Sequence, residues 1–208
     1  MRTSTAASSA STSRRAEDPD PKGRLTVLFG LALDDMEDER SFRWVLPERI
    51  LLPTDGSEDA IRAAEAAADL ARKRGAELHV VHVWHDVRGF AHDVVKRELR
   101  RHGQEILDEQ VEKIRASGGE VTKAYLRRGR TSNEVIALCK EIDAGLLIVG
   151  SRGLGTVRRI LMGSQSEEIV HHAQVPVLVL TGAQDFWPPA RIVIGEDFSE
   201  DARKAGEL

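Results

Sequence analysis

Cysteine is almost absent from this chain, which has one cysteine, Cys139, among 208 residues. A disulfide bond within the chain is therefore excluded, and a reducing compartment, the cytoplasm, is the expected location. Val135, Leu138 and Ile142 recur with Cys139 at helical spacing. This spacing favours a buried thiol over a reactive nucleophile.

An excess of positive charge and a long apolar run are also missing. The formal net charge is −4, which argues against binding nucleic acid through a broad basic surface. The alternating apolar run over residues 25–33 is too short to span a membrane. Apolar residues make up 41% and charged residues 31% of the chain, a balance typical of a globular protein. We therefore expect neither nucleic acid nor membrane as a partner.

Common catalytic and metal-binding patterns are absent as well. The chain has no G-K-[ST] ending of a Walker loop and no G-x-S-x-G elbow. His79, His82 and His85 are spaced by three, and in a strand this spacing sends His82 to the opposite face from the other two. Adjacent His171 and His172 diverge on a helix by about 100°. We therefore expect no zinc site and no catalytic residue, and we predict that the protein is not an enzyme.

The N-terminal region, residues 1–47, differs in composition from the rest. Residues 1–24 are rich in Ser, Thr and Ala and then in charged residues and proline, so they cannot bury enough apolar surface to fold. No apolar segment of a secretory signal follows the early arginine. Residues 25–33 alternate as a strand does, and an accessory strand and a loosely docked segment both fit. We predict a disordered or loosely docked extension.

A regular alternation of strands and helices is predicted over residues 48–181. Strands are expected at 50–52, 78–84, 121–126, 146–149 and 175–180, and helices after Ser57 and at 91–116, 133–142 and 164–172. Ser57 and Gly75 suit the two caps of the first helix. This order predicts an α/β fold, an open parallel sheet with helices on both faces. Pro176 cannot donate to a ladder, which makes the last strand an edge strand.

A glycine-rich stretch follows the fourth strand and has the spacing G-x2-G-x9-G-S, carried by Gly150, Gly153, Gly163 and Ser164. Glycines let backbone N–H groups approach an anion closely, and the helix that follows offers further N–H groups and a favourable dipole. Each part has a simpler explanation: a turn, a solvated basic face, or a capping box of Ser164 with Glu167. Together, between a strand and a helix, they favour a phosphate site.

This spacing resembles the nucleotide-binding signature of the universal stress protein family, in its ATP-binding branch. Residues 49–57, RILLPTDGS, resemble the family's first strand and its aspartate, Asp55. Residues 78–83 and 175–179 resemble its second and last strands. The likeness covers residues 48–181 in order. Gly145 departs from it, since the family often has an aspartate there.

The resemblance implies a Rossmann-like sheet of order 3-2-1-4-5, similar to adenine nucleotide alpha hydrolases. In that order the loops after the first and fourth strands, which carry Asp55 and Gly150, leave toward opposite faces. The crevice between them is the topological switch point, where open α/β sheets bind ligands. The glycine motif and the topology thus indicate the same place.

By this resemblance the ligand is ATP with Mg²⁺, and the protein itself supplies no dedicated metal site. Asp55 would contact the ribose or the metal, although a turn aspartate that only accepts backbone hydrogen bonds is the simpler explanation. Adenine is expected near Val83, with Pro53, Thr54 and Asp55 nearby. The triphosphate is expected on Gly150, Arg152, Gly153, Gly163, Ser164, Gln165 and Ser166.

The function that the resemblance implies is nucleotide-dependent regulation in a stress response, with little or slow ATP turnover. Arg152, Arg158 or Arg159 could clamp a γ-phosphate, but no base to position water is evident. Two alternatives stay open: an adenylyl-transfer or kinase-like enzyme on the same scaffold, and a nucleotide-free dimerisation module. A homodimer through the edge strand, Val175 to Leu180, is expected.

The end of the chain repeats its first strand and turn. Residues 191–208, RIVIGEDFSEDARKAGEL, align with residues 49–66, RILLPTDGSEDAIRAAEA. A strand, an aspartate turn and a helix start that recur at a fixed offset indicate an internal repeat. We predict that residues 182–190 are a linker and that 191–208 are the truncated start of a second, tandem domain. Phe198 replaces the glycine of the first copy, which argues against a nucleotide site there.

Overall fold

A computed structural model describes residues 47–85, 93–151, 163–180 and 187–188. Five strands and four helices alternate in it: β1 Arg49–Pro53, α1 Glu58–Arg74, β2 Glu77–Trp84, α2 Asp93–Ala116, β3 Lys123–Arg128, α3 Thr131–Glu141, β4 Leu146–Gly150, α4 Ser164–His172 and β5 Val177–Leu180. The predicted N-terminal extension, residues 1–47, lies outside the described residues except for residue 47, and the C-terminal repeat 191–208 lies wholly outside them.

The strands form one parallel sheet of order β3-β2-β1-β4-β5. In its centre Ile50 pairs with Leu78 of β2 on one side and with Leu146 of β4 on the other. The predicted fold class and strand order are confirmed. Strands β2 and β3 are added on one side of β1, and β4 and β5 on the other. The carboxyl ends of β1 and β4 therefore form the switch point of the sheet.

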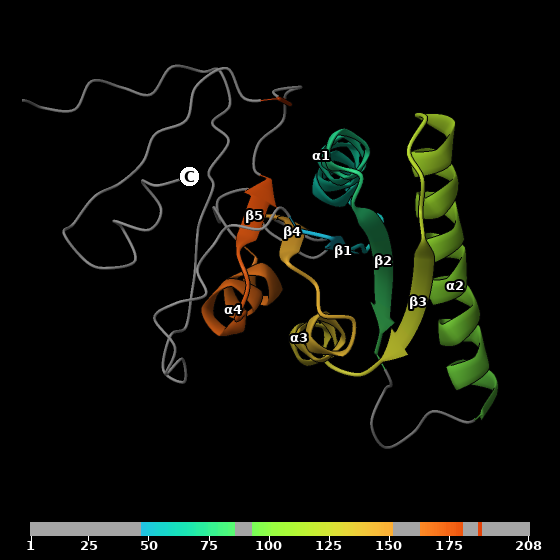
Figure 1. Ribbon diagram of the computed structural model, residues 1–208. Coiled ribbons are helices and arrows are strands. Elements are labelled where there is room, and N and C mark those ends of the chain that lie inside the picture. The colour runs from blue at the N-terminus through green and yellow to red at the C-terminus, as the bar shows by residue number, and fades with distance from the viewer. Residues whose placement is uncertain (1–46, 86–92, 152–162, 181–186, 189–208) are drawn as a thin grey trace, which may run out of the picture.

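Helices cover both faces of the sheet, α1 and α2 on one and α3 and α4 on the other (Figure 1). Alternating side chains of β1 serve the two layers: Ile50 and Leu52 pack with α1 and α2, and Leu51 packs with α3 and α4. Each of these three side chains is fully buried. Apolar runs rather than alternation in the central strands follow from this burial on both faces.

The alanine-rich helix α1 begins and ends at the predicted caps. The Ser57 side chain accepts a hydrogen bond of 3.3 Å from the Ala60 N–H, and Gly75 closes the helix in the left-handed conformation at φ 68°. Small buried residues such as Ala63 and Ala67 let its backbone lie close to the sheet.

Four predicted boundaries, in three elements, were wrong by two residues. Helix α3 begins at Thr131 rather than 133, and β3 runs over Lys123–Arg128 because its register is set by pairing with β2, Lys123 opposite His79. Strand β5 begins at Val177, so Pro176 precedes the strand. The edge position of β5 is confirmed, but the reason given for it, a proline within the strand, is not.

Trp187, in the segment predicted to be a linker, packs against the core cluster under α1. Its indole N–H donates a hydrogen bond of 2.8 Å to Asp69 Oδ2 on that helix. The described part of this segment is thus held on the domain. Within the described ranges, no helix is long and apolar enough to cross a membrane.

Candidate functional site

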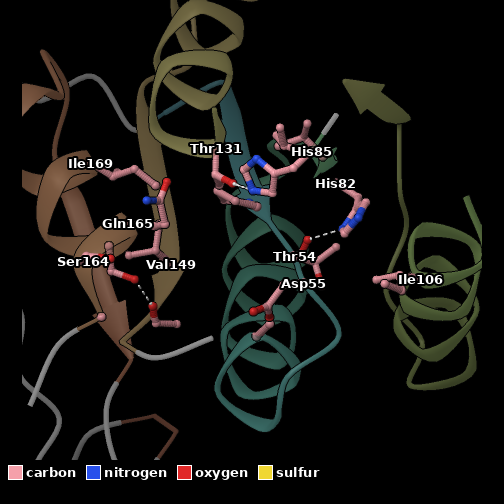
Figure 2. A pocket seen from close by; sticks show the side chains of 17 residues that line it. Thr54, Asp55, His82, His85, Ile106, Thr131, Val149, Ser164, Gln165 and Ile169 are labelled. Carbon is pink, nitrogen blue, oxygen red and sulfur yellow. Dashed lines mark hydrogen bonds between the residues drawn. The ribbon is translucent and has the colours of Figure 1, made fainter. Parts of the chain in front are cut away.

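A cavity of about 480 Å³ opens at the switch point, where β1 and β4 end (Figure 2). This volume lies within the usual range of small-ligand pockets. The residues that line it are Pro53, Thr54, Asp55, Ala60, Val81, His82, Val83, His85, Ile106, Thr131, Val149, Gly150, Gly163, Ser164, Gln165, Ser166 and Ile169. Every predicted contact residue that the structure describes is among them. Arg152 and Gly153, and the basic residues Arg158 and Arg159, lie outside the described residues.

One wall of the cavity is the N-terminal end of α4. The helix begins at Ser164, and its N-cap is Gly163, which has no side chain that could cap it. The capping box expected of Ser164 and Glu167 is therefore not formed, because Ser164 is the first helical residue and not the cap. The first N–H groups of a helix have no partner within it, and with the helix dipole they attract anions. This wall suits a phosphate group.

The side chains at the start of α4 are tied to neighbouring elements. Ser166 Oγ donates a hydrogen bond of 2.8 Å to the Gly150 carbonyl at the end of β4. Gln165 Oε1 accepts one of 3.3 Å from the Ser132 N–H in the first turn of α3. These contacts fix the helix terminus against both β4 and α3.

Asp55 follows β1 and lies in the middle of the cavity wall (Figure 2). Its Oδ1 accepts a hydrogen bond of 3.0 Å from the Ser57 N–H. The simpler explanation, a turn aspartate, is therefore correct for this oxygen. Asp55 also lines the cavity, so the same side chain can both stabilise the turn and contact a bound ligand.

A buried polar network joins the loop after β1 to α2. Thr54 Oγ1 donates a hydrogen bond of 2.9 Å to Gln110 Oε1, and the Gly56 N–H donates to the same hydroxyl oxygen at 3.2 Å. His82 Nδ1 donates to the Thr54 carbonyl at 2.8 Å. Burial lowers the pKa of His82, against the opposing effects of this hydrogen bond and of Asp55. The neutral imidazole therefore carries its proton on Nδ1.

Sequence patterns missed part of the cavity wall. A hydrogen bond of 3.2 Å joins Oγ1 of Thr131, at the start of α3, to Nε2 of His85. Ile106 reaches the cavity from α2 (Figure 2). His85 directly follows β2, and no local pattern shows that the end of β2, the start of α3 and the middle of α2 meet here.

Gly150 has a packing role that the phosphate motif did not predict. A Cβ at this position would lie 2.7 Å from the carbonyl carbon of Asp59 and 2.9 Å from the Ala60 nitrogen. Real Cβ atoms do not approach backbone atoms so closely, and close backbone approach is a typical use of glycine. The absence of a side chain at Gly150 therefore lets the first turn of α1 pack directly against the end of β4.

The described acidic residues, histidines and cysteine do not form a cluster of three or more that could hold a metal ion. Cys139 is buried, as predicted, and burial raises the pKa of its thiol to about 11. A thiol with this pKa is a poor nucleophile at neutral pH.

Comparison with known proteins identifies the family. A sequence profile of the Universal stress protein family matches residues 47–181. The chain belongs to the universal stress protein family. The matched range covers every strand and helix described above, so the fold and the cavity are those of a universal stress protein domain.

Curated relatives agree with this assignment. A universal stress protein of Thermus aquaticus is 36% identical over 141 residues, which are 63% of this chain and 96% of the relative. One of Methanocaldococcus jannaschii is 30% identical over 142 residues, 65% of this chain and 82% of the relative. A solved universal stress protein in complex with cAMP is 26% identical with a TM-score of 0.52, covering 64% of this chain and 97% of its own. One from Archaeoglobus fulgidus is 26% identical with a TM-score of 0.52, covering 64% and 92%.

Proposed function

We propose that this universal stress protein binds ATP at the switch point and that the bound nucleotide regulates its shape or assembly in a stress response. The observation that carries the proposal is the N-terminus of α4, which has a glycine as its N-cap and lines a cavity large enough for a small ligand. Asp55 and Val83 line the same cavity from β1 and β2.

The phosphate half of the proposed site is built from backbone. Gly163 brings the chain into α4 without a side chain, and the N–H groups of Ser164, Gln165 and Ser166 begin the helix. Phosphates at such a helix end are held by N–H groups and by the helix dipole. Binding a phosphate therefore needs little further ordering of the protein, because the helix has already oriented these N–H groups.

The base half of the proposed site lies at the ends of β1 and β2. Val83 is 7% exposed and packs in the core cluster under α3 and α4, so its position is fixed. Pro53 and Thr54 line the cavity at the end of the adjacent strand β1. The solved relative in complex with cAMP supports an adenine nucleotide as the ligand class.

Mg²⁺ is proposed to enter with the nucleotide. Asp55 is the one acidic residue among those described in the cavity wall. Mg²⁺ on a nucleotide takes most of its ligands from phosphate oxygens and water, so one nearby carboxylate is compatible with binding. A metal bound in this way would depend on the nucleotide for its affinity.

We also propose that turnover of ATP is slow or absent and that the protein acts by binding. A steady-state phosphate-release assay separates this proposal from an ATP-using enzyme. Rapid release, or transfer of an adenylyl or phosphoryl group to an acceptor, would establish the enzyme instead.

A homodimer through the edge of the sheet belongs to the same proposal. Within the described part of the chain, β5 pairs with β4 alone. Analytical ultracentrifugation with and without nucleotide measures whether two chains associate and whether ATP changes that equilibrium. A cytoplasmic location stays a prediction from the sequence.

The direct test of ligand class is mass spectrometry of small molecules that co-purify with the protein, followed by calorimetry. We expect ATP or another adenine nucleotide in the denatured extract and saturable binding of ATP. GTP is the matched control, because it carries the same phosphates on a different base. Binding of neither nucleotide would contradict the proposal, and equal binding of both would contradict the adenine half.

A further inference from the structure

Ser151 directly follows β4 and is completely buried. Its N–H donates a hydrogen bond of 2.8 Å to the Leu180 carbonyl of β5, and its carbonyl accepts one of 2.6 Å from the Gly163 N–H. The residue that follows β4 is therefore hydrogen-bonded through its backbone to the N-cap residue of α4. Its position sets where α4 begins.

The side chain of Ser151 is held by α1. Ser151 Oγ donates a hydrogen bond of 2.8 Å to Asp59 Oδ2, across 92 residues of sequence. Asp59 is 4% exposed, in the first turn of α1, and its other oxygen accepts a hydrogen bond from Arg62. A carboxylate in the first turn is also favoured by the helix dipole. The acceptor that holds Ser151 is thus fixed by α1 itself.

Neither Asp59 nor Ser151 lines the cavity, whereas Gly163 and the three residues after it do. From this geometry we infer that Asp59 is a positioning residue for the phosphate half of the site. It acts through Ser151 and Gly163 on the N–H groups at the start of α4. The inference rests on the proposed binding of ATP, and it adds that α1 controls affinity for the phosphates and not for the base.

The charge of Asp59 separates a positioning role from a purely electrostatic effect on ATP binding. Asp59 is an anion close to a proposed phosphate site, so its removal should tighten ATP binding if charge alone mattered. A positioning role predicts the opposite. Asp59→Ala should weaken ATP binding about tenfold or more, the effect of losing one hydrogen bond to a charged group. The affinity of the Asp59→Ala variant for adenosine, which has no phosphate, should differ from that of the parent by less than about twofold.

The control is Glu58→Gln, which removes an exposed acid at the adjacent position of the same helix turn. It should bind both ligands as the parent does. Calorimetry measures ATP, and an NMR titration measures adenosine into the millimolar range. Ser151→Ala should reproduce the loss of ATP affinity, and the double variant should lose no more than either single one. Unchanged or tighter ATP binding by Asp59→Ala, or an equal loss for adenosine, overturns the inference.

A second measurement needs no nucleotide and keeps the two proposals apart. Single-residue amide exchange by NMR on the free protein should show faster exchange at the Gly163 N–H in Asp59→Ala than in Glu58→Gln. Equal exchange at Gly163 in the two variants overturns the positioning role. If Gly163 exchange responds and the parent binds no ATP, the proposed function fails while the link between α1 and α4 stands.

Discussion

His82 Nδ1 lies 2.8 Å from the carbonyl oxygen of Thr54, so the buried imidazole of β2 fixes the backbone that leads into Asp55. Burial also lowers the pKa of this histidine below its ordinary value of about 6.5. Above that pH the imidazole is neutral in both the folded and the unfolded chain. As the pH falls through 6.5, the unfolded chain takes up a proton that the folded chain does not. Stability is then lost until the pH reaches the lower pKa of the folded state.

His82→Asn should therefore reduce the loss of stability between pH 7 and pH 5. In that window the parent should lose up to about 1.4 kcal/mol more per pH unit than the variant. Urea unfolding at several pH values measures the difference. The same substitution at exposed His171 controls for the loss of one histidine from the chain. Parallel curves for the parent and His82→Asn would contradict the prediction.

Trp187 should stabilise the domain although it lies beyond the last strand. Trp187→Phe removes the indole N–H that Asp69 accepts, and the expected loss is roughly 1–2 kcal/mol in the free energy of unfolding. Trp187→Ala should cost more, because it also removes the apolar contact with the core. Denaturant unfolding measures both. A double-mutant cycle with Asp69→Ala should give a coupling energy for the pair, and the absence of coupling would show that the contact does not contribute.

Gly150 should behave mainly as a stability position. Gly150→Ala places a Cβ 2.7 Å from the carbonyl carbon of Asp59, so the backbone of β4 or of the first turn of α1 must shift. The expected cost is about 1–3 kcal/mol, typical of overpacking. Thermal unfolding of the nucleotide-free protein measures it. A variant as stable as the parent would show that β4 and α1 can separate without cost.

The fold could be predicted from the sequence because its signals are local. Strands buried on both faces give continuous apolar runs, and Ser57 and Gly75 mark the ends of α1 by their caps. Strand boundaries that depend on pairing with a neighbouring strand were predicted less accurately. The register of β3 depends on β2, and no pattern within residues 121–128 contains that information.

The candidate site was predictable only where a motif or an alternating strand carries it. The glycine spacing located Gly163 and Ser164, and Asp55 followed from the resemblance to the family and from the strand order that it implies. Nothing in the sequence distinguishes Asp59 from any other acidic residue near the start of a helix. Its contact with Ser151 joins residues 92 positions apart, and such a contact becomes visible only when α1 and the end of β4 are brought together.

The most direct test of the central claim is a calorimetric titration of ATP into nucleotide-free protein, for the parent and for Gly163→Val. Gly163 has φ −75° and ψ 149°, angles that valine adopts readily, so the variant should fold while its side chain takes space that the phosphates need. We predict saturable binding of about one ATP per chain by the parent and no measurable binding by Gly163→Val. Equal affinities in the two proteins, or no binding by the parent, would contradict a nucleotide site at the N-terminus of α4.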